Sequence, residues 1–96
     1  MERVVRIQKA RNRLKKYTAI TSLGRSISFG AIGYPQYKDS TALALYRKGD
    51  TLDPKRRRAY FMRFSGVPSK RAALALERKK AKGRLNSKIL SHRYLW

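Results

Sequence analysis

Residues 16–30 read Lys-Tyr-Thr-Ala-Ile-Thr-Ser-Leu-Gly-Arg-Ser-Ile-Ser-Phe-Gly, and this stretch decides the fold. It contains two segments in which apolar and polar residues tend to alternate, and Ser22-Leu23-Gly24 separates them. In the second segment Ile27 and Phe29 fall on one face of an extended chain, and two serines fall on the other. Alternation on both sides of a short glycine-containing turn is typical of a β-hairpin. We therefore expect a hairpin over residues 16–30.

The residues before the hairpin are also compatible with β-structure. Residues 3–8, Arg-Val-Val-Arg-Ile-Gln, are rich in β-branched side chains, which favour strands. Val4, Ile7 and Leu14 would also share one face of a helix, so a helical N-terminus is the alternative. We expect residues 1–15 to form a basic N-terminal strand or arm, and a strand there would complete a three-stranded antiparallel meander.

Turn-forming residues follow the hairpin. Glycine and proline residues end the second strand, and we expect residues 31–52 to form a tyrosine-rich loop and a short helix. Asp39 or Ser40 would cap this short helix, and Gly49 would lie just beyond its end.

A stronger helix signal begins at Asp53-Pro54. Aspartate is a good N-cap acceptor, and proline is tolerated at the first helical position because its missing N–H group would have no partner there. Ser65-Gly66 supplies the stop. These signals predict a basic helix over residues 53–65.

The C-terminal third contains one further clear helix and one weaker one. Ser69 would cap a basic amphipathic helix over residues 69–82, which Gly83 would close. Residues 83–96 are expected to form a basic tail or a short helix from Ser87. The chain of 96 residues is then a single small α+β domain. It should comprise a small N-terminal β-hairpin or three-stranded antiparallel meander followed by two to four short basic helices.

The charge of the chain is large and unevenly placed. The formal net charge is +20, yet residues 17–46 contain only two cations and one carboxylate, so both flanks are strongly cationic. Like charges at this density oppose compaction until counter-charges arrive, so we expect an anionic partner. There is no cysteine, which excludes disulfides and cysteine-based zinc sites, and no apolar run is long enough for a membrane span.

Three clusters of cations and one further arginine are candidate contact sites. Lys55, Arg56, Arg57 and Arg58 would surround the N-terminus of the predicted helix 53–65, where the helix dipole favours anions. A solvated charge run or a nuclear-import patch is the alternative interpretation. The remaining candidate contacts with an anionic partner or nucleic acid are Arg63, Arg78, Lys79, Lys80, Lys82, Arg11 and Arg13.

Aromatic residues are interleaved with the cations of the predicted helix 53–65. Tyr60, Phe61 and Phe64 lie among arginines, a pattern that can stack nucleic-acid bases. Tyr60 and Phe64 are also four residues apart, as expected for a stripe that faces the core. We favour the core for these aromatic residues.

The sequence gives little support for catalysis. His92 is the only histidine, there is no cysteine, and the five carboxylates are scattered at Glu2, Asp39, Asp50, Asp53 and Glu77. The glycines after the hairpin match neither the dinucleotide-binding nor the phosphate-loop motif. We expect no enzymatic activity, no cofactor, no metal and no small-molecule substrate.

Several short motifs resemble a family of small uncharacterised basic proteins from giant viruses, the nucleocytoplasmic large DNA viruses. The motifs are Lys16-Tyr17-Thr18-Ala19-Ile20, Phe29-Gly30 with Gly33-Tyr34 and Tyr37, Asp53-Pro54 with Arg56-Arg57, Tyr60 and Arg63, and Leu95-Trp96. In such proteins the hairpin commonly ends His-Phe-Gly and the basic helix ends Arg-His, whereas here Ser28 and Phe64 occupy the histidine positions. The resemblance implies a setting in a large DNA virus and its particle.

Together these features lead us to expect a non-enzymatic structural component of a large DNA virus particle, either a minor capsid or an internal scaffold protein. Its cationic helices would bridge acidic surfaces of other virion proteins and contact genomic DNA, and it should not assemble by itself. We expect it in the virion, and in the host cytoplasm or nucleus during assembly. A non-specific nucleic-acid-binding or genome-packaging protein is the alternative, and a ribosomal protein is the third.

Overall fold

Three antiparallel strands come first along the chain and three helices follow. The computed structural model describes all residues from 1 to 96. The strands are β1 (Val4–Lys9), β2 (Lys15–Thr21) and β3 (Ser26–Ala31), and they pair in the order β1-β2-β3. After a 3₁₀ turn, η1 (Arg47–Gly49), come α1 (Pro54–Ser65), α2 (Lys70–Ala81) and α3 (Ser87–Tyr94). The α+β class expected from the sequence is confirmed.

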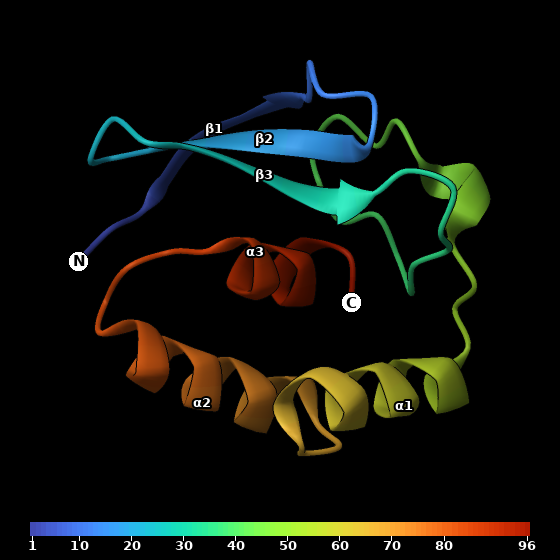
Figure 1. Ribbon diagram of the computed structural model, residues 1–96. Helices are drawn as coiled ribbons and strands as arrows, with labels where there is room; N and C mark the ends of the chain where they lie inside the picture. The colour runs from blue at the N-terminus through green and yellow to red at the C-terminus, as the bar shows by residue number, and fades with distance from the viewer.

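The elements form three layers. Figure 1 shows the sheet on one side, α1 and α2 on the other, and α3 between them. Contacts of α3 with both β3 and α2 agree with this arrangement. The last helix therefore lies at the centre of the molecule.

The predicted hairpin is present, with Ile27 and Phe29 on one face of β3 as expected. Tyr17 lies opposite Phe29 and Ala19 opposite Ile27, so these four apolar residues share one face of the hairpin. The residues of β1 pair antiparallel with β2, which confirms the strand interpretation over the helical one, and a bulge interrupts β1 between Val4 and Arg6.

The core lies between the sheet and α3. Tyr17, Ala19 and Phe29 from the sheet pack with Leu90 and Leu95 from the C-terminal segment, and all five are at most 1% exposed. Burial of apolar side chains is the main favourable term in folding, so α3 and the residue after it contribute much of the stability.

Helix α1 begins and ends at the predicted signals. The Asp53 carboxylate accepts hydrogen bonds from the amides of Lys55 and Arg56, and Gly66 adopts the left-handed conformation (φ 73°) at the other end.

Helix α2 is likewise capped by the Ser69 hydroxyl, but its C-terminus differs from expectation. Lys82, at φ 52°, is the left-handed C-cap, and Gly83, which we expected to close the helix, follows it in the left-handed region at φ 84°. The final helix is real, and its cap is Asn86, whose side chain accepts from the amide of Ile89.

The short helix predicted after Asp39 is absent. Only η1 is helical there, and Asp39 is buried instead of capping a helix at the surface. One of its carboxylate oxygens accepts from the amide and hydroxyl of Thr41, two residues along, as an N-cap would, but no helix follows. The other carboxylate oxygen accepts from Tyr17 Oη and from the Tyr46 amide, so the loop is fixed to the sheet.

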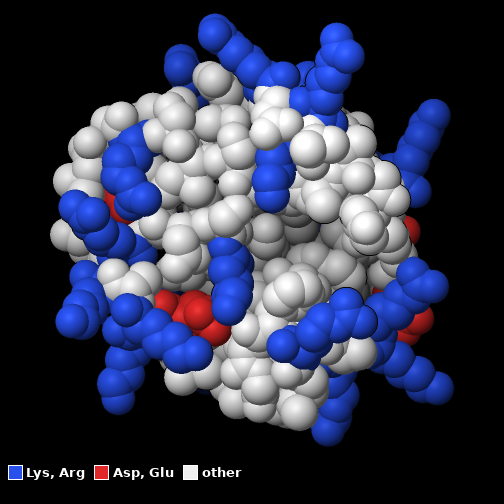
Figure 2. Space-filling model, in the orientation of Figure 1, with Lys and Arg blue, Asp and Glu red and all other residues white.

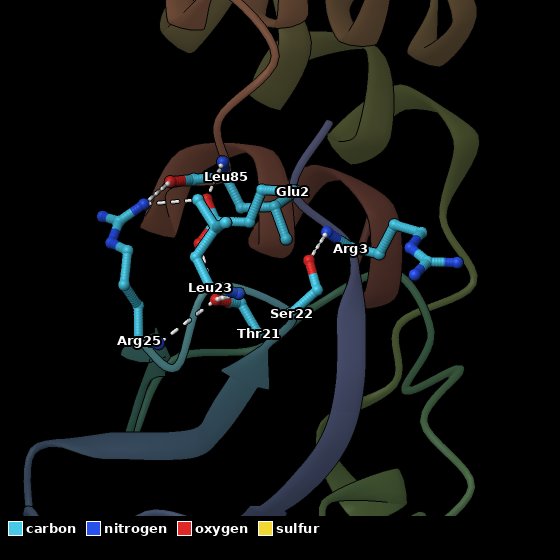
Figure 3. Close-up of polar contacts among 7 residues, drawn as sticks. All are labelled: Glu2, Arg3, Thr21, Ser22, Leu23, Arg25 and Leu85. Atoms are coloured by element: carbon cyan, nitrogen blue, oxygen red, sulfur yellow. Dashed lines mark hydrogen bonds and ion pairs between the residues drawn. The ribbon is translucent and has the colours of Figure 1, made fainter.

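Glu2 joins the N-terminal segment to the loop between α2 and α3. Its buried carboxylate accepts from the Thr21 hydroxyl at 2.6 Å, from Arg25 Nη1 at 2.8 Å and from the Leu85 amide at 2.7 Å (Figure 3). The Glu2 amide donates to the carbonyl of Gly83 at 3.0 Å. The bonds from Thr21 and Leu85, with the charge of Arg25, hold the pKa of Glu2 below its usual value.

A candidate anion-binding cleft

A cleft of about 690 Å³ opens between the ends of β2 and β3, helix α1 and helix α3. Figure 2 shows this face of the molecule, with a hollow between the sheet and the helices and Lys and Arg side chains around it. Five cations contribute to the lining, namely Lys15, Lys16, Arg56, Arg63 and Lys88, and no aspartate or glutamate does. Because cations from separate elements converge on one concave surface, the cleft concentrates positive potential.

One stripe of α1 forms a wall of the cleft. Arg56, Ala59, Tyr60, Arg63 and Phe64 line it, with the i, i+3, i+4, i+7 spacing of one helix face. The prediction that Tyr60 and Phe64 belong to the core is therefore wrong for Phe64, which is 44% exposed, and only partly right for Tyr60, which is half-buried.

The neighbouring face of α1 supplies the buried residue instead. Phe61 is fully buried and contacts the ring of His92 edge-on, with 5.0 Å between the ring centroids. The spacing identified an aromatic stripe correctly, but α3 packs against Phe61 and leaves the rings of the stripe beside the cleft.

Tyr60 and Trp96 form a flat aromatic surface in the cleft wall. Their ring planes are 5° apart and their centroids 4.2 Å apart. Arg57 Nε donates to the carbonyl of Trp96 at 2.9 Å, which holds the end of the chain on α1. Tyr34, 71% exposed, lines the cleft from the loop after β3.

Lys16 is the most buried cation of the cleft, at 4% exposure. Its ammonium donates to the carbonyl of Tyr34 at 2.8 Å and to the side-chain oxygen of Gln36, and no carboxylate lies within ion-pair distance. Burial lowers the pKa of Lys16, and the more distant Asp39 and Asp50 partly offset that effect. A buried ammonium without a direct counter-ion favours an anion beside it.

A chain of four hydrogen-bonded side chains lies behind the cleft. Tyr60 Oη lies 2.8 Å from His92 Nδ1, His92 Nε2 lies 2.7 Å from Ser65 Oγ, and Ser65 Oγ donates to Glu77 Oε2 at 2.8 Å. Because Ser65 donates to Glu77, it accepts from His92 Nε2–H, and His92 Nδ1 accepts from Tyr60. His92 thereby acts as a packing residue that joins α3 to α1.

This chain differs from a hydrolase triad. The serine lies between the carboxylate and the histidine, its proton is held by Glu77, and His92 is fully buried. Burial lowers the pKa of His92 to about 4, against a smaller opposite effect of Glu77. Burial likewise raises the pKa of Tyr60 well above its usual value.

The structure disperses the other predicted contact residues. Only Arg56 and Arg63 of the predicted set line the cleft. A second hollow of about 510 Å³ near the start of α2 is lined by Lys55, Arg57 and Arg58. Arg57 also stacks on Tyr37, with 4.4 Å between its guanidinium carbon and the ring centroid. The amides of Lys55 and Arg56 are already bonded to Asp53, so they are not available to an anion at this end of the helix.

Two predicted clusters lie on other parts of the surface. Arg11 and Arg13 are exposed in the turn between β1 and β2. Exposed cations at the C-terminal end of α2 form the second cluster, in which Lys80 Nζ lies 4.0 Å from Glu77. The members of that cluster are Arg78, Lys79, Lys80 and Lys82.

Sequence reasoning missed Lys15, Lys16 and Lys88 as members of one cationic site. Lys15 and Lys16 are the first two residues of β2 and Lys88 is the second residue of α3, and no local pattern relates positions so far apart in the sequence. The i, i+3, i+4 spacing of cations and aromatics on α1 was the one available signal.

No helix of the structure has the length and apolar character needed to cross a membrane. Comparison with protein-family models, curated proteins and solved structures finds no match to this chain.

Proposed function

We propose that the protein is a non-enzymatic structural component of a large assembly, in which its cationic faces bridge acidic surfaces of neighbouring proteins. The motifs shared with basic proteins of giant viruses suggest that this assembly is the particle of a large DNA virus. The protein would then occur in the virion, and in the host cytoplasm or nucleus while particles assemble.

The separation of its cationic clusters is the observation that supports this role. The turn that carries Arg11 and Arg13 and the end of α2 that carries Arg78 to Lys82 lie at opposite corners of the molecule (Figure 1). The molecule measures 36 × 31 × 20 Å, so two acidic surfaces are able to bind at its ends together. Charge complementarity of this kind gives specificity and fast association, and copies of one cationic chain repel each other.

Aggregation of beads coated with poly-glutamate tests bridging. The protein is expected to aggregate such beads at 50 mM salt and to release them at 500 mM, because surface ion pairs are screened. Replacing Arg78, Lys79, Lys80 and Lys82 with glutamine removes one cluster. We expect this variant to bind single beads but to need at least tenfold more protein for aggregation.

A matched variant tests whether aggregation depends on the positions of the cations or only on the net charge of the protein. Lys9, Lys38, Lys48 and Arg71 are exposed cations outside the clusters, and their replacement with glutamine removes the same charge. This control should aggregate beads as the unaltered protein does. Equal loss in both variants, or no aggregation by the unaltered protein, would refute bridging by separate clusters.

Non-specific nucleic-acid binding is the second candidate, and the cleft favours it because aromatic rings lie among its cations. If the protein neutralises DNA, the logarithm of its affinity should fall steeply and linearly with the logarithm of salt concentration. Titration of labelled single-stranded and double-stranded DNA between 50 and 200 mM salt measures this slope. A shallow slope with weak binding at physiological salt would count against this role.

A further inference from the structure

We propose that the cleft binds one nucleotide, either free or as a unit of single-stranded nucleic acid. Its cations would hold the phosphate, and its aromatic rings would lie against the base. This assignment goes beyond bridging, since the cleft is distinct from both of the clusters proposed to bridge.

The charge of the lining selects an anion with more than one acceptor oxygen. Arg56 and Arg63 reach the cleft from α1, Lys15 and Lys16 from β2, and Lys88 from α3. Guanidinium groups bind phosphate through paired hydrogen bonds, and lysines add point charges. Two of these cations have acidic partners outside the lining, since Arg56 lies 3.9 Å from the partly exposed Asp53 and Lys88 Nζ lies 3.8 Å from Glu77. The other three cations have no carboxylate within ion-pair distance, so most of the charge of the lining is uncompensated.

The most buried part of the cleft also has a positive potential that favours anions. Lys16 lies there at 4% exposure without a carboxylate partner. The first turn of α3, at Ser87 and Lys88, lines the same cleft, and the N-terminal end of a helix carries partial positive charge. These two features come from different elements and point to the same site.

The aromatic side chains distinguish a nucleotide from a simple anion or an acidic peptide. The stacked pair Tyr60–Trp96 and the neighbouring Phe64, whose centroid is 4.8 Å from that of Tyr60, provide flat apolar surface beside the cations. A carboxylate would use only the cations, whereas a nucleotide uses both kinds of residue. Stacking of a base on such rings contributes about 1–3 kcal/mol.

The dimensions favour an unpaired nucleotide. A volume of about 690 Å³ lies within the range of about 300–1,000 Å³ that is typical of small-ligand sites. The faces of bases inside a duplex are already stacked on their neighbours, so only an unpaired base can reach the rings of the cleft.

Trp96 provides the assay because it is the only tryptophan and lines the cleft. Its fluorescence is followed at 150 mM salt during titration with AMP, with a deoxythymidine decamer, with inorganic phosphate and with a poly-glutamate peptide. We expect AMP or the decamer to quench it at saturation, and phosphate to bind at least tenfold more weakly. Tighter binding of the decamer would assign the site to single strands, and tighter binding of AMP to free nucleotides. No quenching by either, or equal affinity for poly-glutamate, would overturn the proposal.

Variants locate the binding. Arg56→Gln with Arg63→Gln should weaken nucleotide binding at least tenfold, whereas Arg78→Gln with Lys79→Gln, of the same net charge, should change it less than twofold. Phe64→Leu should weaken nucleotide binding at least threefold and leave phosphate binding unchanged. Equal loss in the two double variants would refute a site in the cleft. The first double variant should still aggregate poly-glutamate beads, so failure of this proposal is distinguishable from failure of bridging.

Discussion

Replacing Asp39 with asparagine is expected to lower the free energy of unfolding by about 3 kcal/mol. Asp39 is 1% exposed, and its carboxylate is the acceptor in four hydrogen bonds. The donors are Tyr17 Oη, the Tyr46 amide, and the amide and hydroxyl of Thr41. An asparagine amide group would direct its own N–H donors at some of these donors and leave them unsatisfied. Urea denaturation at pH 7 measures the change.

Asp53→Asn is the matched control. Asp53 also accepts amide hydrogen bonds, but it caps an exposed helix end, and asparagine is as good an N-cap as aspartate. We expect this variant to lose less than about 0.5 kcal/mol. Asp39→Ala should cost at least as much as Asp39→Asn. If the Asp39 and Asp53 variants are equally stable, the buried network does not fix the loop.

The second large effect is a loss of stability on mild acidification. Burial lowers the pKa of His92 to about 4, with a smaller opposite contribution from Glu77 and contributions in the same direction from Lys88 and Lys70. Above pH 6.5 the histidine is neutral in both the folded and the unfolded protein, so stability is at its full value. Below pH 6.5 the unfolded chain binds a proton that the folded protein excludes, and stability falls.

Between pH 7 and 5 this imbalance should remove about 2 kcal/mol, with a slope that approaches about 1.36 kcal/mol per pH unit once the unfolded histidine is fully protonated. Glu2 and Asp39 contribute little in this interval because carboxyl groups with ordinary pKa values of 4.5 and 3.8 are mostly ionised above pH 5 even in the unfolded chain. In the folded protein the pKa of Glu2 is lowered, and that of Asp39 is lowered because hydrogen bonds from Thr41 and Tyr17 outweigh the effect of burial. The stability that these two groups contribute is therefore lost mainly below pH 5. Unfolding measured at pH 7, 6 and 5 gives the slope. His92→Gln removes the only histidine and should have no slope in this interval. A flat profile for the unaltered protein would contradict the assigned protonation state.

Local signals predicted most of the fold. Alternation in residues 16–30, the Asp53-Pro54 cap and Ser69 each act within a few residues of chain, so the sequence displays them directly. The helix expected after Asp39 failed because its carboxylate is bonded to Tyr17, 22 residues away, and such a tertiary contact overrides a local capping preference.

Tertiary contacts also explain why only part of the cleft could be predicted from the sequence. The cations and aromatics of α1 are visible as a stripe, but the position of α3 decides which rings of that stripe are buried. Lys16 and Lys88 meet only because α3 is inserted under the sheet, and no local spacing in the sequence encodes that insertion.

Insertion of the last helix between the two outer layers also constrains how the protein is made. The sheet is complete in the chain by Ala31, but Leu90 and Leu95, which pack on it, follow 59 and 64 residues later. At about 5–20 residues per second, a ribosome leaves the hairpin with its apolar face uncovered for roughly 3–12 s. Nascent chains are therefore exposed to chaperones and to self-association until α3 and Leu95 have been synthesised, and a ribosome stalled before α3 would display an open sheet.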